Sequence, residues 1–256
     1  MNTGSTPALF AADPARDARF AVKARWVECD NLPGDDPLHV VEFFHRQMNE
    51  EIDSLEASAQ SLADFPEAPW ALRMELARQC ADEARHAVGY RHHLERGGGH
   101  VGQFPVLNFQ YRIITAQRDL IARLAIQNRS FEAGGLDAIE FGIGQARAGG
   151  QDELAEFYAA QLADEISHVR FANEWIRKAL KAEPRTLLRI GAALDAAARA
   201  FRVVMGREGT DGVEYPAATR ARLEAGFSER EVQATADLAA AAHLARLRGT
   251  ADAAAA

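Results

Sequence analysis

The sequence predicts an all-α protein: a four-helix bundle with a longer crossover between its second and third helices, and a helical extension at the C-terminal end. Apolar residues recur at spacings of three, four and seven along four long stretches, which is typical of helices that bury one face. Proline and glycine clusters end these stretches, and the sequence does not alternate with the period of two that is typical of strands. Two short turns and one longer connection are the pattern of a bundle whose halves are joined by a crossover.

The elements follow in order after an N-terminal arm at residues 1–37, which ends in the turn-forming segment DNLPGDDP. Four bundle helices are expected, at residues 38–62, 70–96, 111–148 and 151–182. The segment HVGQFPVLNF supplies the crossover between the second and third of them. The bundle domain is therefore placed at residues 38–182, and the Ala-rich residues 183–256, broken near GREGTDGVEYP, form the helical extension.

Composition excludes several classes of protein. With 29 Lys and Arg against 37 Asp and Glu, the chain of 256 residues carries a formal net charge of −8, which argues against nucleic acid as a partner because binding phosphates needs clustered basic residues. Two cysteines, Cys29 and Cys80, exclude a disulfide framework and fit a reducing compartment. The N-terminus has no visible signal peptide, and no apolar run approaches the ~20 residues of a membrane span. We therefore expect a cytoplasmic protein without a membrane partner.

Two nearly matching segments carry the chemistry, DEARH at residues 82–86 and DEISH at residues 164–168. Each places a glutamate and a histidine three residues apart, which is one turn along the same face of a helix. Glu83 with His86, and Glu165 with His168, can therefore both point into the bundle. A carboxylate and an imidazole from each of two helices make half of a metal site.

A third Glu-x-x-His, Glu42 with His45, lacks the preceding aspartate and is the kind of match that chance produces. His45 lies six residues before Glu51, which turns it away from that residue's face of the helix. We therefore expect His45 to lie on the helix surface or in a capping role, together with the other histidines outside the two motifs.

Spacing supplies the other half of the site. Glu51 precedes Glu83 by 32 residues and Glu132 precedes Glu165 by 33, so the two halves form an internal repeat. Glu51 and Glu132 each interrupt an apolar helix face, where an unpaired charge would be costly to bury. Glu50 lies about 100° away from Glu51 around the helix. Glu50 is expected to face solvent. Whether Glu50 or Glu51 is the first metal ligand stays open.

Four carboxylates and two imidazoles would be unstable together in an apolar bundle unless divalent cations joined them. An oxygen-rich set with one nitrogen for each metal suits iron or manganese better than structural zinc. A Glu from each of two helices with Glu-x-x-His from the other two is the ligand set of ferritin-like di-iron and di-manganese bundles. The sequence fills all six positions: Glu51, Glu83, His86, Glu132, Glu165 and His168.

These motifs give the chain a family resemblance. Over about residues 10–182 it resembles the ferritin-like di-iron carboxylate proteins. Residues 45–90, from HRQMNEEIDSL to ARHAVGY, resemble a bacterial ferritin-like family of largely unknown function that is distantly similar to the MiaE-type tRNA hydroxylases. The resemblance implies a di-metal site that activates dioxygen or handles iron. It also implies that Asp82 and Asp164 orient the imidazoles of the opposite helices, His168 and His86.

Further residues share the ligand face without a settled role. The pair Gly134-Gly135 is unusual inside a helix and indicates a pocket or a local π-type widening beside the metals, or else close packing against a neighbouring helix. Tyr158 and Trp175 lie seven residues from the second motif, where they would line a pocket, relay electrons or fill the core. Cys80, one turn before the first motif, lines the pocket or is an inert buried thiol.

The expected function is that of a non-haem di-iron oxidoreductase or monooxygenase, with manganese or a mixed manganese and iron pair as alternatives. Such an enzyme uses dioxygen to hydroxylate, N-oxygenate or desaturate a small organic substrate. Its electrons come from a separate reductase, since the sequence shows no Gly-rich nucleotide loop and no cluster-binding cysteines. The alternatives are a ferroxidase or iron-handling protein and, less favoured, a tRNA-modifying hydroxylase. A homodimer stays open.

Overall fold

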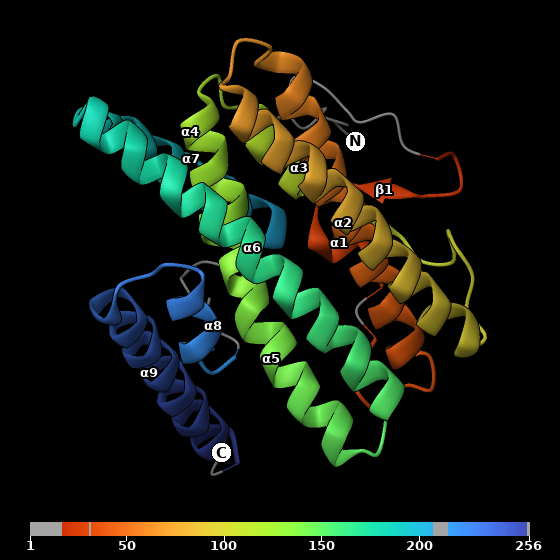
Figure 1. The fold of residues 1–256 in the computed structure, drawn as a ribbon. Coiled ribbons are helices and arrows are strands. Elements are labelled where there is room, and N and C mark those ends of the chain that lie inside the picture. The colour runs from red at the N-terminus through yellow and green to blue at the C-terminus, as the bar shows by residue number, and fades with distance from the viewer. Residues whose placement is uncertain (1–16, 31, 207–214, 255–256) are drawn as a thin grey trace, which may run out of the picture. The chain divides into compact units, whose positions relative to one another are not determined.

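The computed structural model describes residues 17–30, 32–206 and 215–254, and it confirms the all-α prediction (Figure 1). The longest helices are α1 (His39–Asp64), α2 (Trp70–Arg96), α5 (Ala133–Ala148), α6 (Asp152–Ala182), α7 (Thr186–Met205) and α9 (Glu229–Ala254). Residues 1–16 of the predicted N-terminal arm, and residues 207–214 of the predicted break, lie outside the described residues. In the part of the chain that is described, no helix has both the length and the apolarity needed to cross a membrane.

The chain divides into two compact units, each assembled from two stretches of sequence. Unit 1 contains Met1–Gln127 and Glu183–Glu208, and unit 2 contains Asn128–Ala182 and Gly209–Ala256. Residues 183–256 are therefore shared between the units, with α7 in unit 1 and the short α8 (Thr219–Glu224) and α9 in unit 2.

Unit 1 is built on the pair α1 and α2, which pack along each other (Figure 1). Their apolar residues recur every three or four positions, so that one side of each helix is buried between them. The buried side chains include Val41, Phe44, Met48, Leu72, Leu76, Tyr90 and Leu94. A short helix, α3 (Phe109–Thr115), packs on α1, and α7 packs on α3 and on α4 (Leu120–Ile126).

The continuous helix predicted at residues 111–148 is wrong, because the structure divides it. Helix α3 ends at Thr115, and α4 begins after Asp119, whose Oδ1 accepts hydrogen bonds from the backbone N–H groups of Ile121 (2.8 Å) and Ala122 (3.2 Å). This side-chain cap satisfies the first free N–H groups of α4 and so favours a new helix start over continuation. After α4 the backbone widens into a π-helical segment, η2 (Gln127–Glu132), which leads into α5.

A small parallel sheet was not predicted. Two-residue strands β1 (Val22–Lys23) and β2 (Val106–Leu107) pair with Val22 opposite Val106, and they join the N-terminal segment to the crossover. Strands of this length leave no readable alternation in the sequence.

Unit 2 is built on the pair α5 and α6, with α8 packed on both and α9 packed on α8 (Figure 1). Mostly small side chains allow the close approach of α8, and they form one buried cluster: Ala133, Leu136, Ile166, Val169, Ala218, Ala221 and Ala225. One stripe of α6 then caps the end of α8. Arg170, Asn173 and Arg177 donate hydrogen bonds of 2.7 to 2.9 Å to the backbone carbonyls of residues 224–226, which a helix C-terminus leaves without partners.

Candidate metal centre

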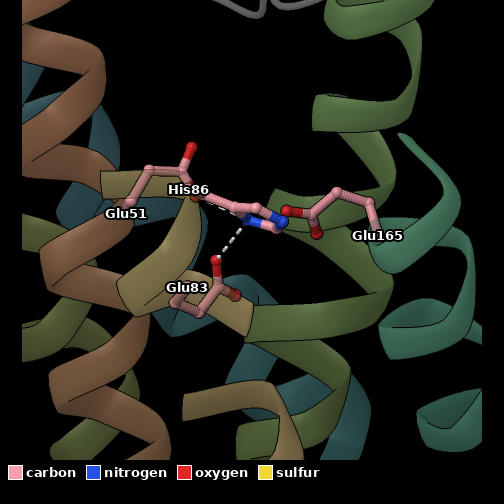
Figure 2. Close-up of side chains that lie close together, drawn as sticks. All are labelled: Glu51, Glu83, His86 and Glu165. Atoms are coloured by element: carbon pink, nitrogen blue, oxygen red, sulfur yellow. Dashed lines mark hydrogen bonds and ion pairs between the residues drawn. The ribbon is translucent and has the colours of Figure 1, made fainter. Parts of the chain in front are cut away.

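Unit 1 contains one of two buried clusters of carboxylates and an imidazole. Glu51 comes from α1, and Glu83 and His86 come from α2, three residues apart on one face. The Nδ1 atom of His86 lies 3.3 Å from Glu51 Oε2 and 3.2 Å from Glu83 Oε2 (Figure 2). All three side chains are buried. Because one ring nitrogen carries at most one proton, it cannot fully satisfy two carboxylates.

Unit 2 contains the second cluster, formed by Glu132, Glu165 and His168. Glu132 is the last residue of η2, and the other two lie three residues apart on α6. One ligand atom from each of the three lies within 4.8 Å of the others, and His168 Nδ1 lies 3.4 Å from Glu165 Oε2. These side chains are also buried. Each unit therefore presents two carboxylates and one imidazole nitrogen in one place.

Both clusters fit a divalent cation. Two ligand atoms held about 2.1 Å from a shared ion, at angles between octahedral and tetrahedral, lie roughly 3.0 to 3.4 Å apart. The measured separations between imidazole nitrogen and carboxylate oxygen, 3.2 to 3.4 Å, fall in this range. A cation also balances the negative charge that two buried carboxylates bring together. Each cluster could hold a metal ion, and its oxygen-rich donor set is of the kind that suits iron or manganese.

Hydrogen-bond donors surround Glu83, and sequence reasoning missed them. Its Oε1 atom accepts a hydrogen bond from the Ser54 hydroxyl (2.8 Å) and a longer one from the Gln79 amide (3.2 Å). The Gln127 amide in turn donates to the hydroxyl oxygens of Ser54 (3.1 Å) and Ser58 (2.8 Å). All of these side chains are buried. One signal was available, because a glutamine stands four residues before the glutamate of both motifs, at positions 79 and 161.

The π-helical segment supplies a second donor. The amide of Asn128, at the start of η2, donates a 2.8 Å hydrogen bond to Oε2 of Glu132, at its end. A π-type widening was one interpretation of Gly134-Gly135, and the π-helical segment ends at Glu132, with only Ala133 between it and this pair. A Cβ atom at Gly134 or Gly135 would have no neighbour within 4 Å, so close packing does not explain the two glycines.

The acids next to the predicted ligands are placed as follows. Asp82 is buried and accepts hydrogen bonds from both terminal nitrogens of Arg85, at 3.1 and 3.0 Å. Asp164 is half-buried. The predicted roles of both aspartates at the imidazoles stay predictions. Glu50 is half-buried and accepts a hydrogen bond from the Gln47 amide (3.1 Å), whereas its neighbour Glu51 lies beside the imidazole of α2.

The remaining candidates make contacts typical of packing. Tyr158 is buried, and burial raises the pKa of its hydroxyl to about 12. Its ring lies so close to α5 that a Cβ atom at Gly142 would be 3.1 Å from it. Trp175 is half-buried beneath the ammonium group of Lys178, 4.3 Å from the ring centroid. The thiol of half-buried Cys80 faces a backbone carbonyl of α1 at 3.8 Å.

The expectation that His45 lies on the surface is wrong. Its side chain is 0% exposed, between the rings of Phe20 and Phe104, and its Nε2 accepts a 2.9 Å hydrogen bond from the backbone N–H of Gly102. The crossover and the N-terminal segment cover this face of α1, which helical periodicity within α1 could not reveal.

Comparison with known proteins places the chain in a family. A search of curated proteins found no match. The family described as "Protein of unknown function (DUF455)" matches residues 5–233, a range that contains both carboxylate and imidazole clusters. The match covers most of the 256 residues, and the chain belongs to this family of proteins of unknown function, DUF455.

Proposed function

We propose that the chain is a ferritin-like di-metal oxidoreductase that uses dioxygen to oxidise a small organic substrate. One observation carries this proposal: each compact unit holds a buried cluster of two glutamates and one histidine. The internal repeat of the sequence relates the two clusters to each other, and in this proposal they supply the ligands of two metal ions. The proposed ligands are Glu51, Glu83 and His86 from unit 1 and Glu132, Glu165 and His168 from unit 2.

This proposal assigns separate roles to the bound metal ions and to the side chains that hold them. When bound, a pair of iron ions supplies the reductive activation of dioxygen, a reaction that amino-acid side chains cannot perform. The glutamates balance the charge of the cations, and Nδ1 of each histidine completes the donor set. Burial of all six side chains excludes bulk water from the oxidising centre. Substrate hydroxylation, N-oxygenation and desaturation are the reactions that such a centre supports.

The electrons come from a separate donor in this proposal. The sequence has neither a Gly-rich nucleotide loop nor the cysteines that bind an iron–sulfur cluster. Neither Cys29 nor Cys80 forms a disulfide bond, as expected in the reducing cytoplasm, where we place the protein. Manganese, or a mixed pair of manganese and iron, is the alternative to two iron ions.

Oxygen uptake tests the proposed reaction. Metal-free protein is loaded anaerobically with two equivalents of Fe(II), mixed with oxygenated buffer and a chemical reductant, and followed with an oxygen electrode. We expect catalytic oxygen uptake that stops in the His86→Ala and His168→Ala variants. Uptake that persists in both variants would overturn the assignment of these ligands to the reaction.

The same preparation separates an oxidoreductase from an iron-handling protein. An iron store would oxidise and retain many Fe(II) ions per chain and would assemble into a large hollow oligomer. The oxidoreductase should bind about two ions per chain and elute as a monomer or dimer in size-exclusion chromatography with light scattering. A shell-sized particle that retains excess iron would replace the proposed function with storage.

A further inference from the structure

One side of helix α7 carries apolar side chains that face solvent. The buried residues of α7 pack on α3 and α4. Away from that contact, Leu187 is 61% exposed, Leu188 is 74% exposed and Leu194 is 36% exposed. Because each residue turns a helix by about 100°, these leucines lie within about 120° of one another and form one face. Together with Gly191 they are called the leucine face, and contact with another molecule would remove its apolar surface from water.

Gly191 lies in the middle of the leucine face, and the fold of the single chain does not require a glycine there. It stands inside α7 with helical backbone, where glycine is less favourable than alanine. A Cβ atom at this position would meet no described atom within 4 Å, so no neighbour in the chain needs the space. A glycine on an exposed helix face does allow a second helix to approach closely, to about 8 Å between the two axes.

The sequence around Gly191 is complementary to itself when two copies of α7 run antiparallel and cross at this residue. Leu188 and Leu194 stand three residues to either side of it, so Leu188 of one copy meets Leu194 of the other. Glu183 and Arg199, both exposed, stand eight residues to either side, so opposite charges come together at each end. A parallel pairing would instead place each charge against its own kind. The sequence therefore favours the antiparallel arrangement, which a twofold axis closes.

We propose that the leucine face of α7 is the interface of a homodimer, in which two copies of the chain cross at Gly191 about a twofold axis. The occupant is a second copy because the leucines and charges of this helix are matched by the same residues in reverse order. The face of a single helix is smaller than the roughly 1,200–2,000 Å² that stable complexes bury. We therefore expect a reversible dimer that dissociates on dilution. This inference goes beyond the proposed metal chemistry and does not depend on it.

Sedimentation velocity of the full chain over a range of concentrations tests the interface. We expect a monomer–dimer equilibrium in the wild type. Leu188→Lys should weaken it about 100-fold, because the twofold axis applies the loss of buried apolar surface twice. The matched control is Leu238→Lys on α9, where Leu238 is 63% exposed, and it should leave the equilibrium within about threefold. A wild type that stays monomeric at every concentration, or equal effects of the two substitutions, would overturn the proposal.

A Gly191→Gln variant separates an interface from a local role of the glycine. The Cβ atom has room in the single chain and glutamine favours the helix, so resistance to urea should stay equal or rise. In the dimer the same side chain occupies the crossing point, so dimerisation should weaken at least about 10-fold. Dimerisation that is unchanged in this variant would overturn the crossing at Gly191.

Charge exchange tests the direction of pairing. Arg199→Glu places two glutamates together at each end of an antiparallel interface, so it should weaken the dimer about threefold at low salt. Adding Glu183→Arg restores opposite charges and should recover the wild-type affinity. A parallel dimer brings like charges together in all three proteins, so the absence of both loss and recovery would overturn the antiparallel pairing. Oxygen uptake and metal content are measured separately, so failure of the proposed function would leave these results unchanged.

Discussion

The buried ion pair between Arg222 and Asp137 makes a quantitative prediction about unit 2. Arg222 of α8 meets Asp137 of α5 through two parallel hydrogen bonds, Nε to Oδ1 at 2.8 Å and Nη2 to Oδ2 at 2.6 Å. Nη2 also donates to the backbone carbonyl of Ala133 at 2.8 Å, and the N–H of Ala218 donates to Oδ1 of Asp137. Both side chains of the pair are buried. The pair thus links α8 to α5, the helix that begins directly after the candidate ligand Glu132.

Replacing Arg222 with Met removes three hydrogen bonds and leaves the carboxylate of Asp137 buried with one remaining donor from the backbone of α8. Breaking a buried pair in this way typically costs 3–5 kcal/mol, because an uncompensated charge stays inside the protein. We expect Arg222→Met to lower the free energy of unfolding of unit 2 by about 4 kcal/mol. The assay is urea denaturation followed by circular dichroism.

The matched variant adds Asp137→Asn to Arg222→Met. A neutral amide has no charge to compensate and can still accept the hydrogen bond from the backbone, so about 2 kcal/mol of the loss should return. A loss below about 1 kcal/mol in the single variant would refute this account of the pair. Equal stability of the single and double variants would show that the uncompensated charge is not the cause of the loss.

Three further predictions concern unit 1. Burial lowers the pKa of His45 from 6.5 to about 4, so the unfolded chain binds its proton first. Stability should therefore be full above about pH 6.5 and fall by up to about 3 kcal/mol toward pH 4, less steeply in His45→Phe, as measured by urea denaturation at each pH. A Cβ atom at Gly99 would lie 2.4 Å from Leu94 Cδ1. Gly99→Ala should therefore cost roughly 1–3 kcal/mol in the same assay. Gly34→Ala, with no neighbour within 4 Å of its Cβ atom, should change stability by less than about 0.5 kcal/mol. Burial raises the pKa of the Cys29 thiol to about 11, so iodoacetamide at pH 8 should leave Cys29 unmodified in the folded protein, as read by peptide mapping.

Features that repeat along one helix were predictable from the sequence. The three-residue spacing of Glu83 and His86 fixes them on one face of any helix, and the structure brings both together in a buried cluster with Glu51. The helical spacing of apolar residues, and the proline and glycine residues that end each stretch, likewise located α1, α2 and α6 to within a few residues. These features depend only on the geometry of a single helix, which relates residues that are close in sequence.

Features that depend on tertiary contacts were not predictable in the same way. His45 is buried because the N-terminal segment and the crossover cover it. Neither contact shows in the spacing of apolar residues along α1. Ser54 reaches Glu83 from another helix, 29 residues away in sequence, and a serine on a helix face carries no sign of its acceptor. Asp119 did carry a local signal, since an aspartate before an apolar run is a preferred N-cap. The apolar stripe that continues beyond it concealed the break.

A count of bound metal tests the central claim most directly. Native mass spectrometry of the metal-free protein after addition of Fe(II) under nitrogen, or of Mn(II), should show about two ions per chain. The Glu83→Ala, His86→Ala variant and the Glu165→Ala, His168→Ala variant remove ligands from one cluster each, and each should lose at least one ion. No stoichiometric metal in the wild type, or two ions retained in both variants, would contradict the account.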